Sequence, residues 1–250
     1  FPSTTLFRSQ HRDIRPELRA RRMERSPGVG QAVNLLSPEQ QIRLQSIATL
    51  ADVPRGGLIF GEGNPADLLF VMARGMARIS RVSLSGRRQV MAFKMAGDLL
   101  GYPEQGIYVN TGRAVSAATV YRIPWRKLSV LLRRDPEMHT SFLTRMAFDV
   151  RQAQKRIMAL GQQNVAQRLS SFLLDLMEYS DFYEPQRCQL SLQLTRFDLA
   201  DYLGTTPETV VRILARLEHD GLIQRLTARL LEIRDADGLA RLLEERRRTG

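Results

Sequence analysis

The 250-residue sequence has a single cysteine, Cys188, and only three histidines. One cysteine cannot form an internal disulfide, and so few thiols argue against a multi-cysteine metal cage or an iron–sulfur cluster. No run of about 18 apolar residues occurs, so no membrane-spanning helix is expected. The charged start and apolar stretch of a secretory signal are also missing. These absences predict a cytoplasmic protein that does not contact a membrane.

The sequence also lacks the residue combinations on which enzymes depend. It has no paired nucleophile and base, no metal-ligand spacing and no Gly-Lys phosphate loop. We therefore expect no enzymatic activity, no metal and no cofactor. A single histidine can hold haem, and His139 is the only candidate near a predicted domain boundary. A surface or core histidine is the simpler interpretation of this residue.

Lysine is almost absent from a strongly basic chain. Of the 37 Lys and Arg residues, only Lys94, Lys127 and Lys155 are lysines. The net charge of +11 favours a polyanionic partner such as DNA, because bound cationic side chains release counterions from phosphates. Arginine content also reflects genome composition, so the charge supports DNA binding without establishing it.

The first part of the chain has no sustained apolar periodicity. Seven arginines fall between Arg8 and Arg25, and Ser26-Pro27-Gly28 interrupts any helix. We expect residues 1–33 to form a disordered Arg-rich tail. Residues 1–9 resemble the translation of a sequencing adapter, and we exclude them from the functional argument.

Short apolar stretches alternate with glycine-rich turns in the first half of the chain. Ser37 can cap a short helix whose first residue is Pro38. Over residues 53–123 the alternation of strands and turns predicts an antiparallel barrel or sandwich. The expected strands are residues 58–60, 68–72, 77–82, 89–93 and 115–123.

A long helix is expected over residues 135–160, with a hinge at Gly161. Its apolar side chains recur at spacings of three and four, close to the a and d positions of nearly three heptads. Such a seam can pack on the body of its own chain or form a dimer interface, and we favour the homodimer. The seam consists of Phe142, Met146, Val150, Ala153, Ile157 and Leu160.

Residues 194–224 read as two short helices joined by a tight turn. Gly204 supplies the permissive backbone that the turn needs. Glu208 lies three residues after Thr205, as in a capping box, and Pro207 fits the first turn of the second helix. The buried stripes of the two helices are Leu199, Tyr202 and Leu203, then Val210, Ile213, Leu214 and Leu217.

The opposite face of the second helix carries Glu208, Val211 and Arg212. In a helix-turn-helix this face enters the major groove of DNA. Arginine pairs with guanine and glutamate accepts from cytosine, so Glu208 and Arg212, one turn apart, can read adjacent base pairs. From these residues alone, the alternative is an ordinary helical hairpin with a solvated charged face.

This segment resembles the DNA-binding helices of the CRP/FNR superfamily of bacterial transcription regulators. There a Glu near the start of the recognition helix and an Arg four residues later read the half-site. Glu208 and Arg212 match, and Val211 stands where Ser or Gly is usual. The resemblance implies a TTGAT-like palindrome read by these three residues. It also implies phosphate contacts from Thr195, Arg196, Thr206, Thr209 and Arg216.

The resemblance extends over roughly residues 35–245. Gly75 and the Gly97–Gly101 turn are similar to the glycines and the GD-x-x-G turn of cyclic-nucleotide-binding domains. The fold implied is α+β, closest to the FNR/FixK/DNR-like branch without its iron–sulfur cysteines. Its parts are a β-roll (a cyclic-nucleotide-binding-like jelly roll) over 34–134, a dimerisation helix over 135–160 and a winged helix-turn-helix over 161–250.

The effector pocket implied by this fold departs from the cyclic-nucleotide pattern. That pattern has a Glu after the turn and an Arg followed by Ser or Thr, because a buried phosphate needs charged donors. Tyr102 takes the place of the Glu, and Arg113 precedes Ala114. Tyr102, Glu104 and Arg113 are therefore a weak candidate pocket, and a cyclic-nucleotide-responsive regulator is the alternative function.

Two further features carry weaker interpretations. By analogy with family activating surfaces, the turn formed by Ser85, Gly86, Arg87 and Arg88 is a candidate contact for RNA polymerase; the alternative is a solvated hairpin tip. Oxidation of Cys188 would add bulk near DNA, but no neighbouring residue activates its thiol, and a passive loop cysteine is the alternative.

Overall fold

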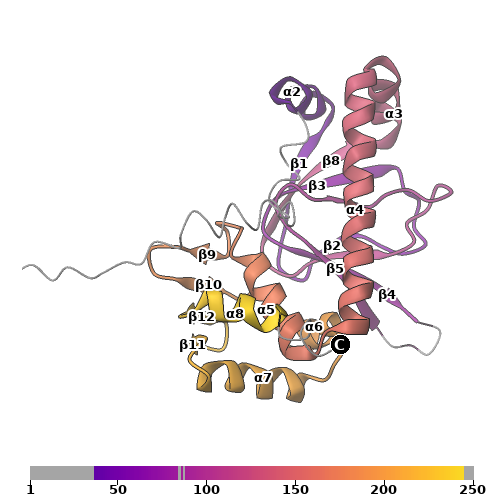
Figure 1. The fold of residues 1–250 in the computed structure, drawn as a ribbon. Coiled ribbons are helices and arrows are strands. Elements are labelled where there is room, and N and C mark those ends of the chain that lie inside the picture. The colour runs from indigo at the N-terminus through magenta and orange to yellow at the C-terminus, as the bar shows by residue number, and fades with distance from the viewer. Residues whose placement is uncertain (1–36, 84–85, 87, 245–250) are drawn as a thin grey trace, which may run out of the picture.

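The structure is a computed structural model and describes residues 37–83, 86 and 88–244. The predicted tail, residues 1–33, lies outside the described residues. Figure 1 shows a β-roll, a long upright helix beside it and a mostly helical C-terminal domain below. The predicted α+β architecture, with a β-roll, a long helix and a helix-turn-helix, is confirmed.

The β-roll consists of two antiparallel four-stranded sheets. One has the order β1-β8-β3-β6 and the other β2-β7-β4-β5. Phe60, Phe70 and Tyr108 fill the space between them, with ring centroids 4.7 to 6.4 Å apart. The strands are β1 (Thr49–Val53), β2 (Leu58–Phe60), β3 (Leu68–Arg74), β4 (Ala77–Val82), β5 (Arg88–Lys94), β6 (Leu99–Leu100), β7 (Thr111–Ala114) and β8 (Ala118–Pro124).

Helices close the upper end of the roll. In α2 (Pro38–Ile47) the side chain of Ser37 accepts from the backbone N–H of Gln40, as the cap prediction requires. Helix α3 (Trp125–Arg134) was not predicted, because no capping side chain marks its start at Pro124. The buried Leu128 of α3 and the half-buried Phe142 of the long helix that follows belong to one apolar cluster.

The predicted strand over residues 115–123 begins three residues late, at Ala118. The residues before it turn the chain between β7 and β8 and pack against Gly75. Gly75 has φ of +81°, and a β-carbon there would lie 2.3 Å from the carbonyl oxygen of Ala117. Only glycine tolerates this positive φ and close approach, so the turn depends on Gly75.

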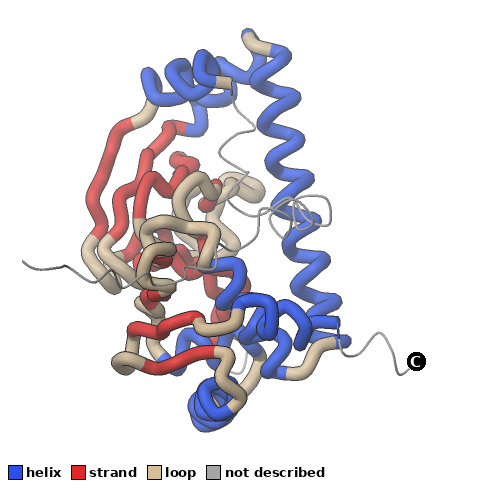
Figure 2. The backbone as a smooth tube through the Cα atoms, turned by 60° about the vertical axis from the view of Figure 1, so that its left-hand side comes forward, coloured by secondary structure: helices blue, strands red, loops and turns tan. Residues whose placement is uncertain are grey.

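The long helix α4 spans Pro136–Gln162 and runs along one edge of the molecule (Figure 2). Asp135 caps it by accepting from the backbone N–H of Met138 at 2.9 Å. The helix continues through Gly161, the predicted hinge residue, and ends at Gln162. The helical conformation does not continue at Gln163, because Asn164 caps the next helix, α5 (Val165–Leu176), with a capping box.

The C-terminal domain is built from four helices and a small sheet. The sheet has the order β11-β12-β10-β9. Strands β11 and β12 form the wing. The remaining elements are β9 (Tyr183–Glu184), β10 (Gln189–Ser191), α6 (Arg196–Leu203), α7 (Pro207–His219), β11 (Ile223–Arg225), β12 (Leu230–Ile233) and α8 (Ala236–Glu244).

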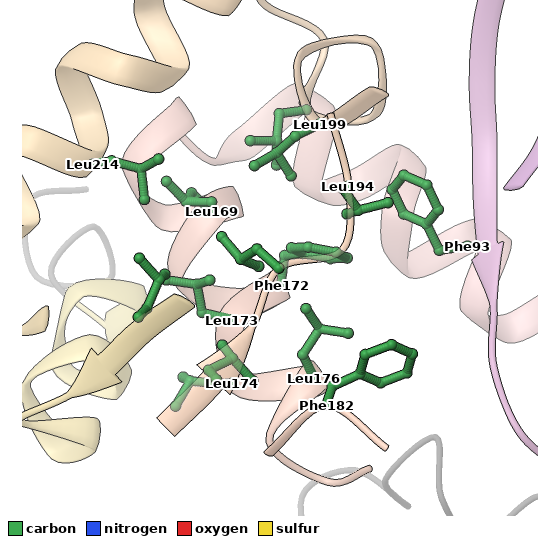
Figure 3. Packing of buried hydrophobic residues seen from close by; sticks show 14 of the residues in the cluster. Phe93, Leu169, Phe172, Leu173, Leu174, Leu176, Phe182, Leu194, Leu199 and Leu214 are labelled. Atoms are coloured by element: carbon green, nitrogen blue, oxygen red, sulfur yellow. The ribbon is translucent and has the colours of Figure 1, made fainter. Parts of the chain in front are cut away.

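One apolar core joins the C-terminal domain to the β-roll. Leu169, Phe172 and Leu173 of α5 form its centre, and Figure 3 shows Phe93 of β5 among the same side chains. The rings of Phe93 and Phe172 lie 5.7 Å apart. The two domains are therefore docked on each other. No described helix is long and apolar enough to cross a membrane.

Candidate nucleic-acid interface

The tight turn between α6 and α7 is made by Gly204. This residue caps α6 in the left-handed conformation, with φ of 65° and ψ of 46°. A β-carbon here would also lie 3.2 Å from Leu160 at the end of α4. The turn fixes the angle between the two helices, as a helix-turn-helix requires.

The N-cap of α7 is Thr206, so the predicted capping box of Thr205 and Glu208 was wrong. The hydroxyl of Thr206 accepts from the backbone N–H of Thr209 at 3.3 Å. A proline disfavours helical conformation in the residue before it, and Thr206 is extended, with φ of −102° and ψ of 156°. Pro207 therefore decides which threonine caps the helix.

We expect Thr206→Ala to lower the free energy of unfolding by about 1 kcal/mol, because a helix N–H loses its acceptor. Thr205→Ala is the matched control and should change it by only a few tenths. Chemical denaturation of both variants measures the difference. Equal losses would contradict the assignment of the cap.

The two faces of α7 differ sharply. Val210, Leu214 and Leu217 are buried in the core, and Ile213 is half-buried. On the opposite face Glu208, Arg212 and the 46 % exposed Val211 lie open. The three predicted base-reading residues therefore share one accessible surface.

The charged groups of this face have few partners among the described residues. Hydrogen bonds from its own backbone N–H and from Thr206 lower the pKa of Glu208, which keeps the carboxylate an acceptor. Arg212 makes no ion pair with any residue that the structure describes. Arg216 lies 3.6 Å from Asp220 on the exposed surface, a weak contact that a phosphate can replace.

The other predicted phosphate contacts lie around the start of α6 and α7. Thr195 caps α6, accepting from the backbone N–H of Asp198 at 3.0 Å. The side chain of Arg196 donates to the carbonyl of Ala228 in the wing, 2.8 Å away. Desolvation and the neighbouring Arg225 lower the pKa of Arg196. The structure thus brings Arg196 together with the wing.

The basic surface of the wing was not predicted. Arg229 is exposed at the tip of the wing. The guanidinium of Arg225 lies 2.6 Å from the carboxylate of Glu218. The arginine spacing along residues 225–234 was the available signal. It was weak, because the chain is rich in arginine throughout.

The predicted dimer seam lies on the outer face of α4. Met146, Val150, Ala153, Ile157 and Leu160 are exposed, and Ile157 reaches 69 % exposure. Phe142 instead packs partly against the β-roll. Leu143 and Met158, 54 % and 58 % exposed, were not predicted and extend the apolar strip.

The weak effector pocket is only partly assembled. Tyr102 and Glu104 line a cavity of about 320 Å³. Arg113 lies outside it and donates to the carbonyl of Gly56 at 2.7 Å. Gly112 and Ala114 are buried on the inner face of β7. Because successive residues of a strand alternate between its two faces, the Arg113 side chain lies on the outer face. The prediction that Arg113 belongs to this pocket was wrong.

Two polar groups of the pocket, Tyr102 and Lys94, are held by Asp149 of α4. The Tyr102 hydroxyl donates to Asp149 at 2.8 Å, and burial raises the pKa of Tyr102. Lys94 lies 3.2 Å from the same carboxylate. The cavity therefore has no uncommitted arginine or lysine side chain among the described residues to receive a phosphate.

Only part of the turn that is a candidate contact for RNA polymerase lies within the described residues. Ser85 and Arg87 lie outside the described residues, and Arg88 forms ion pairs with Asp198 and Asp201 of α6. Arg88 is therefore held against α6 and does not project freely from the turn. Its partners lie more than a hundred residues away in sequence, so no local pattern reveals them.

Cys188 and His139 were the candidates for redox and haem chemistry. Cys188 is half-buried in a turn with φ of 52°, and its sulfur lies 3.6 Å from the carbonyl oxygen of Pro185. Burial and the neighbouring thiol raise the pKa of Tyr183 to about 12. His139 is exposed in the first part of α4. Across the described residues no cluster of three or more potential metal ligands occurs.

Comparisons with known proteins match both halves of the chain. A family described as "Crp-like helix-turn-helix domain" matches residues 167–242, and "Cyclic nucleotide-binding domain" matches residues 50–135. The chain is 34 % identical over 201 residues to the nitrogen fixation regulation protein FixK of Azorhizobium caulinodans. That match covers 79 % of this chain and 80 % of the relative.

Two further similarities agree with this result. The fumarate and nitrate reduction regulatory protein of Escherichia coli is 26 % identical, with 76 % of each chain covered. The solved structure of FixK2 from Bradyrhizobium japonicum superimposes with a TM-score of 0.72 at 26 % identity. It covers 78 % of this chain and 97 % of that chain.

Proposed function

The chain belongs to the CRP/FNR superfamily of DNA-binding transcription regulators, and from this premise we propose that it binds a palindromic promoter site as a homodimer. Glu208, Val211 and Arg212 read the bases of each half-site. The protein acts as a regulator in the cytoplasm, where the chromosome is, and not as an enzyme.

The observation that carries this proposal is the open face of α7. An ionised carboxylate and a guanidinium without an ion pair among the described residues stand one turn apart on it, over a buried apolar stripe. Arginine donates two hydrogen bonds to guanine, and glutamate accepts one from cytosine. The exposed Val211 adds an apolar contact, such as one with a thymine methyl group.

Phosphate contacts position this helix in the groove. Thr195, Thr206 and Thr209 surround the N-termini of α6 and α7, where the helix dipole favours anions. Arg196 and Arg216 supply charge on either side. The wing arginine Arg229 extends this surface.

The apolar strip on α4 supports the dimer. Side chains such as Val150 and Ile157 are more than half exposed in the single chain, and their spacing is that of a helix seam. A two-fold axis along the seam would pair each residue with its own copy or a near neighbour. It would also place two α7 helices on successive major grooves, about one DNA turn apart.

We propose that DNA binding needs no cyclic nucleotide. The outward Arg113 and the committed Lys94 leave no arginine or lysine for a cyclic phosphate in the described part of the pocket. Transcription control makes RNA polymerase a further partner. Because the guanidinium of Arg88 is bound to α6, we do not assign the polymerase contact to it.

Selection from random duplex DNA tests the proposal. We expect the purified chain to enrich an inverted repeat whose half-sites lie about one helical turn apart, equally with and without cyclic AMP. Enrichment of a single unrepeated site would contradict the dimer. Enrichment only with cyclic AMP would favour the nucleotide-responsive alternative.

A further inference from the structure

The β4–β5 hairpin and helix α6 share a charged contact, which we call the interdomain cluster: Arg78, Arg88, Asp198 and Asp201. Arg88 Nη2 lies 2.9 Å from Asp198 Oδ1 and 2.7 Å from Asp201 Oδ2. Its Nε donates to the same Asp201 oxygen at 3.0 Å, and Arg78 pairs with Asp198. Two β-roll arginines thus hold two carboxylates of the helix-turn-helix.

This cluster is shielded at Asp198 and Arg78, whereas the side chains of Arg88 and Asp201 are 32 % and 31 % exposed. The Asp198 side chain is 5 % exposed, and that of Arg78 is 17 % exposed. Exposed pairs contribute little to stability, but removing one partner of a shielded pair leaves an uncompensated charge. The position of α6 is therefore sensitive to these arginines.

The cluster connects directly to the DNA-facing side of α6. Asp198 also accepts from the Thr195 hydroxyl at 2.8 Å, and its backbone N–H is capped by Thr195. Thr195 is a proposed phosphate contact. One carboxylate therefore links the β-roll arginines to a residue at the DNA surface.

An apolar contact beside the cluster holds the same elements together. Tyr202 of α6 packs on Phe93 of β5, with ring centroids 4.9 Å apart, and Arg156 of α4 lies 3.6 Å above the Tyr202 ring. Apolar contacts bury surface area but allow several relative orientations of the two surfaces, whereas paired charges favour one orientation. The cluster is thus suited to set the orientation of α6.

The docked arrangement leaves the base-reading face open. In Figure 1, α7 lies on the side of the C-terminal domain away from the β-roll. Glu208, Val211 and Arg212 are exposed while α6 is held. The cluster therefore does not mask the DNA surface.

We propose that Arg78 and Arg88 are positioning residues for DNA binding: through Asp198 and Asp201 they fix the helix-turn-helix on the β-roll in the protein without a small molecule. This inference rests on the proposed function for the identity of the DNA-reading face. The ion pairs take the place of an effector in setting the orientation of the domain.

A charge-swap cycle on the full-length chain tests the proposal, with affinity for the selected DNA site as the readout. Arg88→Glu should weaken binding about five- to tenfold, because the new carboxylate faces Asp198 and Asp201. Asp201→Arg should also weaken binding, although it adds positive charge that would by itself attract phosphates. The double variant should return to within about twofold of the parent.

Arg81→Glu is the matched control. Arg81 lies in the same hairpin and pairs with Glu62 at 3.2 Å on the surface, so the net charge changes equally without touching α6. Arg88→Gln provides a milder variant should Arg88→Glu fail to fold, with about two- to fourfold weakening expected. Circular dichroism and sedimentation check folding and assembly.

Hydrogen exchange of α6 amides in the DNA-free protein separates this proposal from the proposed function. Faster exchange in Arg88→Glu, but not in Arg81→Glu, is expected whatever the DNA site is. Tighter binding by Asp201→Arg, absence of rescue in the double variant, or unchanged exchange would each overturn the positioning role. Failure of the parent to select a repeat while exchange behaves as expected would overturn only the proposed function.

Discussion

Arg212→Ala is expected to cost about 1–3 kcal/mol of DNA-binding free energy at each half-site, and about twice that for a dimer on a palindrome. The guanidinium is exposed, and no ion pair holds it among the described residues. Its loss removes two hydrogen bonds to a base edge. Discrimination should relax at one symmetric pair of positions, which affinities for single-base variants of the site will show.

Arg216→Ala is the control for this prediction. Arg216 is on the same helix and 70 % exposed, but we assign it to phosphate. Its loss should weaken binding to all sequences alike and reduce the salt slope by about one per contact. The assignment fails if Arg212→Ala loses affinity uniformly while Arg216→Ala changes the preferred sequence.

Ile157→Glu is expected to convert the protein to monomers and to reduce affinity for the palindrome by about a hundredfold or more. Ile157 is 69 % exposed near the C-terminal end of the apolar strip, so the introduced carboxylate would face the partner's strip across the interface. Each half-site would then bind a separate monomer, without the gain in affinity that a linked second subunit provides. Sedimentation velocity and DNA titration measure the two effects.

Thr144→Glu introduces the same carboxylate on the same helix outside the seam. Thr144 is exposed, and its hydroxyl donates only to the carbonyl of Thr140. This variant should remain dimeric with parental affinity. A dimeric Ile157→Glu would contradict the seam, and a monomeric Thr144→Glu would place the interface elsewhere on α4.

The helix-turn-helix was predictable because its signals are local. The apolar spacing of α7 and the glycine between the helices depend on a few neighbouring residues, and both agree with the structure. The cap was assigned one residue early because two threonines precede Pro207. The restriction that proline places on its predecessor selects Thr206.

The contacts between distant segments were not predictable. Arg113 was assigned to the pocket from its place in a motif, but a strand's alternation directs it outward, and one residue of register reverses that direction. Arg88 was assigned to a solvent-facing turn, but the docked α6 supplies its partners. Such pairings arise only from the tertiary arrangement.

The most direct test of DNA reading is the salt-dependent affinity of the purified, ligand-free protein for a duplex with two inverted TTGAT half-sites. A scrambled duplex of the same composition is the control. We predict binding about a thousandfold tighter than to the scrambled duplex at physiological salt. Selective binding should persist as salt rises, because base contacts depend less on counterion release than phosphate contacts do. Equal affinity for the two duplexes at every salt concentration would contradict the proposed reading of this half-site by Glu208, Val211 and Arg212.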